Sequence, residues 1–222
     1  MSEAAPAATA VLVRDAAHGL EVLLLRRNSQ LAFHGGAWVF PGGRIDPSDA
    51  GAGGEEGVAR RAAAREAREE AGLTVDPDSL VQISHWTTPE GLPKRFATWF
   101  FVGPGDTTQV RVDGGEIHEH AWRTPRAALE ARGRGEIELP PPTFVTLCTL
   151  APHARATDAL AAARASTPSV YLPRVVRVAG GAISLYPADA GWEARDPERA
   201  GPRHRLLMLE SGWSYVRELS AS

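Results

Sequence analysis

Hydrophobic and polar positions along the first part of the chain predict short strands separated by turns. Apolar, branched residues fill 9–13 and 20–25 with a short polar stretch between them, which indicates two strands joined by a turn. A third short strand at 37–40 runs into Pro41-Gly42-Gly43, where we predict a sharp turn. Residues 46–54 are Asp, Pro, Ser, Gly and Ala, and this composition predicts a loop.

A helix is predicted at 55–71. Its alanines at four-residue spacing, from Ala59 to Ala71, form a narrow stripe on one face that can approach a sheet closely. Gly72 is a natural stop for this helix because glycine adopts the left-handed conformation without strain.

The rest of the chain separates into two regions. Up to residue 167 the pattern predicts strands at 80–86, 96–102, 109–112 and 117–122, and helices at 125–132, 143–150 and 158–165. From Pro168 it predicts strands at 171–178, 183–186, 205–210 and 213–217 around glycine turns. We therefore predict a main domain at 1–167 and a β-rich extension at 168–222 packed on it.

Composition narrows the classes of function. The net charge is -3 and the pI is about 6.2, which argues against nucleic acid as a partner because such binding needs clustered positive charge. No run approaches the roughly 18 apolar residues of a membrane span, and the start has no apolar signal-peptide core. We expect a cytoplasmic protein that does not bind membranes. Cys148 is the single cysteine and is predicted to be a buried thiol.

Three acidic residues near the end of the predicted helix carry the chemical signal. Glu66, Glu69 and Glu70 stand at i, i+3 and i+4, so their carboxylates share one face. Like charges at this spacing cost roughly 0.2–0.5 kcal/mol per pair, and acids at a helix C-terminus cost about 0.3–1 kcal/mol each. A divalent cation would offset these costs, and carboxylates suit Mg²⁺ or Mn²⁺. The alternative is a solvated charged helix face.

Neighbouring residues complete a longer pattern. Pro41-Gly42-Gly43 precedes an acidic loop, and 65–73 reads Arg-Glu-Ala-Arg-Glu-Glu-Ala-Gly-Leu. Together these residues resemble the Nudix box. The resemblance implies an α/β/α sandwich with a mixed β-sheet and a metal-dependent hydrolase that cleaves a diphosphate bond. Counting from Gly43, the first glutamate of the box falls on Asp49, and an insertion of eight residues follows it. The role of Asp49 is therefore open.

The resemblance also assigns roles to single residues. It implies that Glu66, Glu69 and Glu70 bind Mg²⁺ or Mn²⁺, with the backbone carbonyl at Gly43 completing the coordination. It implies that Arg65 orients a helix glutamate through an ion pair.

A carboxylate must also take a proton from the attacking water. We expect Glu66 or Glu69 to be this base. Glu116 and Glu119 belong to a stretch, 116–122, that resembles the late acidic strand of the family ahead of a tryptophan, and they are alternatives as base or as an extra ligand. Both could also be ordinary exposed strand residues.

A second resemblance concerns the substrate. Leu23-Leu24-Leu25-Arg26-Arg27, Phe40 ahead of Pro-Gly-Gly, and Trp86-x-Thr88-Pro89 are similar to the coenzyme A diphosphatase branch related to the peroxisomal enzyme. The arginine that the strict coenzyme A signature places after Ser29 is absent, and Ala32-Phe33 stands there. The resemblance implies cleavage of coenzyme A or acyl-coenzyme A to a 4′-phosphopantetheine species and adenosine 3′,5′-bisphosphate.

Four residues are candidates for binding this substrate. Arg27 and Arg95 could bind phosphate, and Phe40 and Trp86 could contact the base or the pantetheine arm. For Arg95 the alternative is a surface ion pair, and for Trp86 it is core packing.

Other functions stay open at this stage. Within enzymes, the substrate could be ADP-ribose, a dinucleotide or a nucleoside triphosphate. A non-catalytic Nudix-fold module that senses a nucleotide is an alternative from another class. The extension could form a homodimer or a lid.

Overall fold

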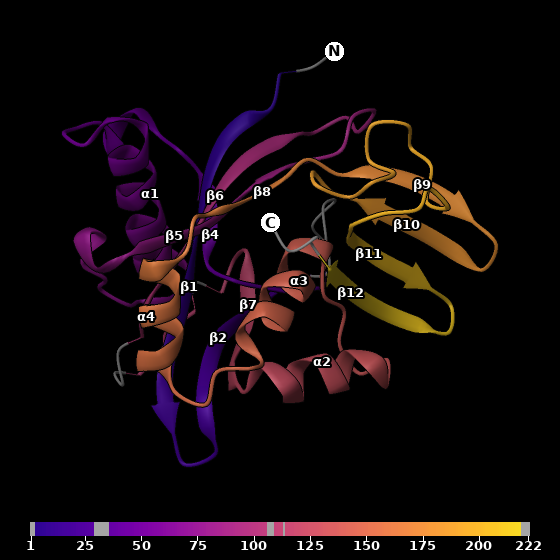
Figure 1. Cartoon of the computed structure of the whole chain (residues 1–222). Helices are drawn as coiled ribbons and strands as arrows, with labels where there is room; N and C mark the ends of the chain where they lie inside the picture. Colours follow the sequence, from indigo (N-terminus) through magenta and orange to yellow (C-terminus); the bar gives the residue numbers. More distant parts are fainter. Residues whose placement is uncertain (1–2, 29–35, 106–108, 113, 219–222) are drawn as a thin grey trace. The chain divides into compact units, whose positions relative to one another are not determined.

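The computed structural model describes residues 3–28, 36–105, 109–112 and 114–218 (Figure 1). The chain forms two compact units. The larger comprises Ala5–His85 and Thr98–Ser169, and the smaller comprises Trp86–Ala97 and Val170–Ser222 with the first residues of the chain. Ser29 and Ala32-Phe33, which belong to the substrate resemblance, lie outside the described residues.

The main β-sheet is built around the N-terminal hairpin. Its strands are β1 (Ala5–Ala16), β2 (Gly19–Arg27), β3 (Trp38–Val39), β4 (Gly42–Arg44), β5 (Val81–Thr87), β6 (Phe96–Pro104) and β7 (Ile117–Arg123). They run in the order β3-β2-β1-β6-β5, and β8 (Ser169–Tyr171) follows β5, while β4 pairs with β1 and β7 pairs with β2. The predicted first turn is confirmed, because Ala16 pairs with Gly19 across it. This is the predicted mixed sheet with helices.

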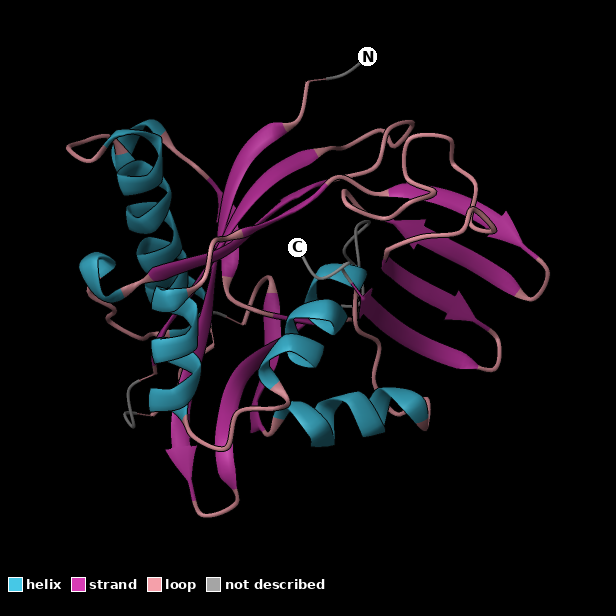
Figure 2. Cartoon of the chain, in the orientation of Figure 1, coloured by secondary structure: helices cyan, strands magenta, loops and turns pink. Residues whose placement is uncertain are grey.

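Helices cover both faces of this sheet (Figure 2). On one face lies α1 (Gly54–Ala71), and the predicted alanine stripe from Ala59 to Ala71 is fully buried against the sheet. On the other face lie α2 (Pro125–Gly133) and α3 (Pro141–Leu150), while α4 (Ala156–Ala165) completes the larger unit. The Gly72 stop is confirmed, since this residue caps α1 at φ +69° in the left-handed conformation.

Two expectations near the site are corrected. Pro41-Gly42-Gly43 was predicted as a turn, but Gly42–Arg44 forms β4 and pairs with Ala7–Thr9 of β1. Glycine permits this close pairing because a Cβ at Gly42 would lie 2.5 Å from Thr9 Oγ1. The predicted loop at 46–54 contains a short 3-10 helix, Pro47–Asp49.

The strand predicted at 109–112 is wrong. These residues form no strand, because their backbone bonds the end of α1 instead of a sheet ladder. The amide of Arg111 donates to the carbonyl of Ala71 at 2.9 Å, and Val110 is buried in the core beneath that helix. In residues 109–112, the backbone therefore caps α1 and the apolar side chains pack into the core.

The smaller unit contains the predicted C-terminal β-sheet. It is an antiparallel series of β9 (Arg174–Val178), β10 (Gly181–Leu185), β11 (Arg203–Leu209) and β12 (Gly212–Glu218). The strand predicted at 171–178 divides into β8 (Ser169–Tyr171) and β9, because Pro173 lacks the N–H that a ladder needs. Its core holds the stacked rings of Trp86 and Tyr171.

A buried ion pair shapes the long connection between β10 and β11. Arg205 donates to both oxygens of Asp189 at 2.7 Å, and both side chains are nearly inaccessible. The pKa of Asp189 lies below its usual value, because hydrogen bonds from Arg205 and from the His204 amide outweigh the effect of burial.

Among the helices of the described residues, none is both long enough and apolar enough to cross a bilayer.

Candidate metal and catalytic site

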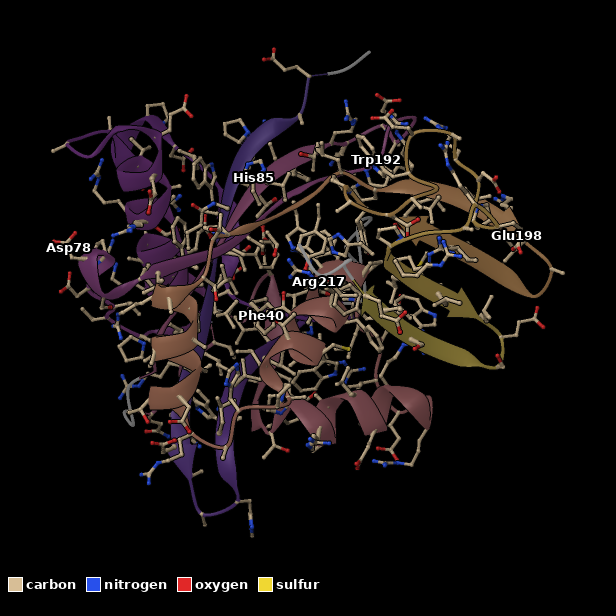
Figure 3. The ribbon with its side chains drawn as sticks, viewed as in Figure 1. Phe40, Asp78, His85, Trp192, Glu198 and Arg217 are labelled. Atoms are coloured by element: carbon tan, nitrogen blue, oxygen red, sulfur yellow. The ribbon has the colours of Figure 1, made fainter. Side chains whose placement is uncertain are left out.

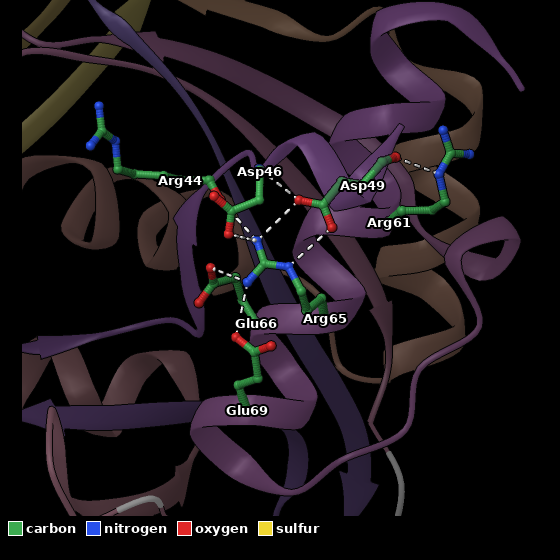
Figure 4. Close-up of polar contacts among 7 residues, drawn as sticks. All are labelled: Arg44, Asp46, Asp49, Arg61, Arg65, Glu66 and Glu69. Atoms are coloured by element: carbon green, nitrogen blue, oxygen red, sulfur yellow. Dashed lines mark hydrogen bonds and ion pairs between the residues drawn. The ribbon is translucent and has the colours of Figure 1, made fainter. Parts of the chain in front are cut away.

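Arg65 is the centre of a network of carboxylates on α1 and the loop before it (Figure 4). Its Nε and Nη2 donate to the two oxygens of Asp49, each at 3.0 Å. Its Nη1 donates to Glu66 at 2.8 Å and to Glu69 at 2.9 Å, and Nη2 also donates to the carbonyl of Arg44. The predicted ion pair between Arg65 and a helix glutamate is therefore present, and the fork of the guanidinium aligns three acids.

Asp49 reaches Arg65 despite the inserted residues that follow it. The 3-10 turn Pro47–Asp49 returns the Asp49 side chain to the amide of Asp46, which donates to Oδ2 at 2.8 Å. Asp49 is only 4% exposed. Burial alone would raise its pKa, but the hydrogen bonds from Arg65 and Asp46 outweigh burial and keep the pKa below its usual value. Asp49 is thus ionised and paired with Arg65.

Glu66 lies directly against β4. A Cβ at Gly43 would overlap the Glu66 carboxylate, so only glycine leaves room for that carboxylate beside the strand. Burial raises the pKa of Glu66, the contact with Arg65 opposes this rise, and the nearby charge of Glu69 adds to it. The structure thus brings together Glu66 and Gly43, both predicted from sequence.

Glu70 is the most deeply buried of the three helix acids. It is 7% exposed, and its Oε2 accepts a hydrogen bond from the Gly42 amide at 3.0 Å. Burial raises the pKa of Glu70 to about 8, and the charges of Glu66 and Glu116 contribute to the rise, whereas the Gly42 amide and Arg27 oppose it. A carboxylate so placed is costly when ionised without a cation nearby.

The chemistry of these donors fits a hard divalent cation. Glu66 and Glu70 bring carboxylate oxygens next to Gly43 and Gly42, and the charge of Glu66 adds to the burial that raises the pKa of Glu70. In the arrangement that the structure shows, Glu69 turns to Arg65. Within the described residues, no three His, Cys, Asp or Glu side chains are gathered tightly enough to hold a metal as they stand.

The two late acids have different surroundings. Glu116, just before β7, lies 3.7 Å from Arg27 and contributes to the raised pKa of Glu70. Glu119, within β7, pairs with Arg26 at 3.2 Å and is exposed. Glu116 therefore acts electrostatically on Glu70, whereas Glu119 forms an ion pair with Arg26.

The remaining substrate-binding candidates lie in different surroundings. Phe40, labelled in Figure 3, is buried edge-to-face against Phe100 in the larger unit. Trp86 belongs to the smaller unit, where it is 4% exposed and stacks on Tyr171 at 3.8 Å between ring centroids. Arg95 is in the same unit and donates through Nε to the carbonyl of Thr88. Core packing accounts for both aromatic rings.

The sequence left the role of Asp49 open and gave no sign of the contact that Arg61 makes. The spacing of Asp46 and Asp49 matches that of a capping box, and this signal could have placed Asp49 at a short helical turn. Arg61 donates through Nε to the Asp49 carbonyl at 2.7 Å. Arginine within a helix is too common to mark such a contact beforehand.

Comparisons with known proteins agree with this architecture. The model of the NUDIX domain matches residues 4–141, more than half of the chain. The Putative nudix hydrolase 7 of Caenorhabditis elegans is 27% identical over 165 residues, which cover 58% of this chain and 55% of the relative. The chain thus spans about half the length of that curated relative.

Solved structures of NUDIX proteins share this fold. A NUDIX hydrolase from Alicyclobacillus acidocaldarius is 26% identical, with a TM-score of 0.66 over 76% of this chain and 98% of that one. The NUDIX domain of Shewanella oneidensis NrtR, crystallised with ADP ribose, is 14% identical, with a TM-score of 0.53 over 75% and 91%, and shows the fold alone. The match of the domain model to more than half of the chain agrees with the Arg65 network on α1. The chain therefore belongs to the NUDIX domain family.

Proposed function

We propose that this protein is a divalent-metal-dependent hydrolase that cleaves the diphosphate bond of a nucleoside diphosphate linked to another group. The observation that carries the proposal is the placement of two partly or fully buried helix carboxylates, Glu66 and Glu70, against the glycine strand β4. Family membership supports it. Carboxylate oxygens are the donors that a hard divalent cation prefers.

In this proposal the metal ligands are Glu66, Glu69 and Glu70, with the backbone at Gly43. Bound Mg²⁺ or Mn²⁺ would neutralise the phosphate charge, orient the diphosphate and lower the pKa of water. Glu70 is held by the Gly42 amide, so its carboxylate keeps one orientation. Arg65 donates hydrogen bonds to Glu66 and Glu69 and so orients both carboxylates.

The proton from the attacking water needs an ionised carboxylate within reach. Glu66 and Glu69 are our first candidates for this base, because both lie on the helix face that carries the ligands. Glu116 is the next candidate, since its charge acts on Glu70. We propose that Arg27, whose Nη2 lies 3.7 Å from Glu116, binds a substrate phosphate.

Coenzyme A and acyl-coenzyme A are the substrates we propose within this class. The support is the sequence resemblance at Leu23–Arg27 and around Phe40. Hydrolysis would release a 4′-phosphopantetheine species and adenosine 3′,5′-bisphosphate, and these products distinguish the reaction from cleavage elsewhere in the molecule.

Replacing one proposed ligand tests the assignment. Glu70→Gln keeps the size of the side chain and removes its charge, so we expect kcat to fall by about tenfold or more at saturating Mg²⁺. Glu56→Gln is the matched control, because Glu56 lies on the same helix and pairs with Arg60. Chromatographic assay of products measures both variants. Wild-type rates for Glu70→Gln would contradict the ligand assignment.

A substrate panel tests the specificity. Coenzyme A, acyl-coenzyme A, ADP-ribose and a dinucleotide are assayed with Mg²⁺ and with Mn²⁺. Preferred cleavage of ADP-ribose or the dinucleotide would overturn the coenzyme A assignment and keep the hydrolase. Calorimetric binding of a nucleotide with no turnover of any diphosphate would instead indicate a sensing module.

A further inference from the structure

The loop between Asp49 and α1, residues 50–53, is bound by the side chain of Arg61, and the rest of the eight-residue insertion forms the first turn of α1. Arg61 donates through Nε to the carbonyl of Asp49 at 2.7 Å and through Nη1 to the carbonyl of Ala52 at 2.9 Å. The loop folds closely over this guanidinium, since a Cβ at Gly51 would lie 3.0 Å from its central carbon. Both ends of the loop segment that follows Asp49 are thereby fixed to α1.

Arg61 and Arg65 act on the same acid from successive turns of α1. They stand at i and i+4 and share a helix face. Arg61 binds the backbone of Asp49, and Arg65 binds its carboxylate through two hydrogen bonds (Figure 4). The backbone and the side chain of Asp49 are therefore each held by one arginine.

We infer that Arg61 is a positioning residue, which holds Asp49 at Arg65 and so sets the orientation of the Glu66 and Glu69 carboxylates for a divalent cation. The inference rests on the proposed function, in which those two glutamates are metal ligands. Arg61 would thereby keep Asp49 at Arg65 although eight residues are inserted between these two positions.

An insertion adds conformational freedom to the loop, and this freedom is the reason why a residue such as Arg61 is needed. A longer loop has more conformations in which Asp49 lies away from Arg65, and each would leave Arg65 to rotate toward Glu66 or Glu69 alone. The two carbonyls that Arg61 binds remove this freedom. Residues that orient the ligands of a metal affect its affinity without touching it.

The chain offers a matched control in the adjacent arginine. Arg60 lies on the same helix and pairs with Glu56, one turn earlier, by an i,i+4 ion pair. Arg60→Ala and Arg61→Ala thus make the same change in charge and helix propensity, and only the second releases the loop. Arg61→Lys keeps the charge but lacks the planar fork that reaches two carbonyls.

The test measures Mn²⁺ binding by electron paramagnetic resonance, together with kcat and KM for diphosphate substrates at several Mn²⁺ concentrations. For Arg61→Ala we expect Mn²⁺ affinity and kcat to fall by about tenfold while substrate KM at saturating Mn²⁺ changes little. Arg61→Lys should recover part of the loss. Arg60→Ala should match wild type. Asp49→Asn should resemble Arg61→Ala, and the double variant should lose little more than either alone.

Hydrogen exchange of residues 50–53 in metal-free protein reports the loop directly. Faster exchange in Arg61→Ala than in Arg60→Ala, together with weaker Mn²⁺ binding, supports the inference. Should Arg61→Ala fail to fold, Arg61→Lys and Asp49→Asn carry the same comparison.

Two other outcomes are distinguishable. If wild type binds Mn²⁺ and hydrolyses a diphosphate, but Arg61→Ala behaves as Arg60→Ala does, the positioning role is overturned and the proposed function stands. If wild type neither binds Mn²⁺ nor hydrolyses any diphosphate, the proposed function and this inference are both overturned.

Discussion

Glu70 combines burial with negative neighbours, and this combination makes its proton affinity depend on folding. Its carboxylate is 7% exposed and accepts one hydrogen bond from the Gly42 amide. The ordinary pKa of a glutamate is near 4.5, and burial raises that of Glu70 to about 8. A bound cation would favour the ionised form of Glu70. Folding, proton binding and metal binding would therefore all depend on this one carboxylate.

We predict that the stability of metal-free protein depends on pH through Glu70. The folded-state pKa lies above the unfolded one, so the folded protein binds the proton more tightly. The contribution of Glu70 is fully present below about pH 4.5 and is lost as the pH rises toward about 8, with a slope approaching 1.4 kcal/mol per pH unit, to order of magnitude. Urea unfolding in EDTA at several pH values, for wild type and Glu70→Gln, measures the difference between them.

The half-exposed Glu69 provides the control for this prediction. Glu69→Gln should keep the pH slope of wild type, because its side chain is 51% exposed and solvent screens its charge. Stability curves of wild type and Glu70→Gln that run parallel from pH 5 to 8 would contradict the assignment of Glu70 as the linked group.

At the scale of elements, β4 has two glycines with different neighbours. A Cβ at Gly42 would meet β1, at 2.5 Å from Thr9 Oγ1 and 2.7 Å from the Ala8 carbonyl. The three atoms nearest to a Cβ at Gly43 all belong to the end of the Glu66 side chain. A paired backbone moves with difficulty, whereas a carboxylate can rotate away. The first glycine therefore serves the sheet and the second serves the site.

We predict that alanine at these two positions separates stability from activity. Gly42→Ala should lower the free energy of unfolding by about 1–3 kcal/mol, because β1 cannot give way without strain. Gly43→Ala should stay within about 1 kcal/mol of wild type and lower kcat by about tenfold through displacement of Glu66. Chemical unfolding and a diphosphatase assay on both variants measure the two effects. Equal losses of stability with unchanged kcat in Gly43→Ala would refute this division.

At the scale of the whole molecule, the smaller unit combines segments that are distant in sequence. Trp86 comes from the end of β5, and it stacks on Tyr171 and lies edge-on to Tyr186, at 5.5 Å between centroids. The rings of this cluster are nearly inaccessible to solvent. A boundary at residue 167 therefore separates Trp86 from the aromatic residues that cover it.

We predict that a chain ending at residue 167 exposes Trp86. Its fluorescence, isolated as the difference between each chain and its Trp86→Phe variant, should shift to longer wavelength on truncation. Loss of the stacked rings should also lower Tm by about 5 °C or more. An unshifted difference spectrum with an unchanged Tm would show that 1–167 folds and covers this residue without the extension.

The elements with strong local patterns could be predicted from the sequence. The alanine spacing and Gly72 determined α1 and its end, and glycine turns between apolar runs determined the strands of the C-terminal sheet. The spacing of Glu66, Glu69 and Glu70 placed three carboxylates together on one helix. These features depend on residues a few positions apart, so periodicity and backbone preference suffice to determine them.

Only the tertiary structure decided which distant residues meet. Residues 109–112 have the alternation of a strand, yet their backbone caps α1, and Pro41-Gly42-Gly43 has the composition of a turn, yet Gly42 and Gly43 pair with β1. Asp49 contacts Arg65 although eight residues are inserted between them, and Arg61 binds the loop that follows Asp49. These outcomes follow from which backbone groups find partners once the core has formed, and the local sequence contains no record of those partners.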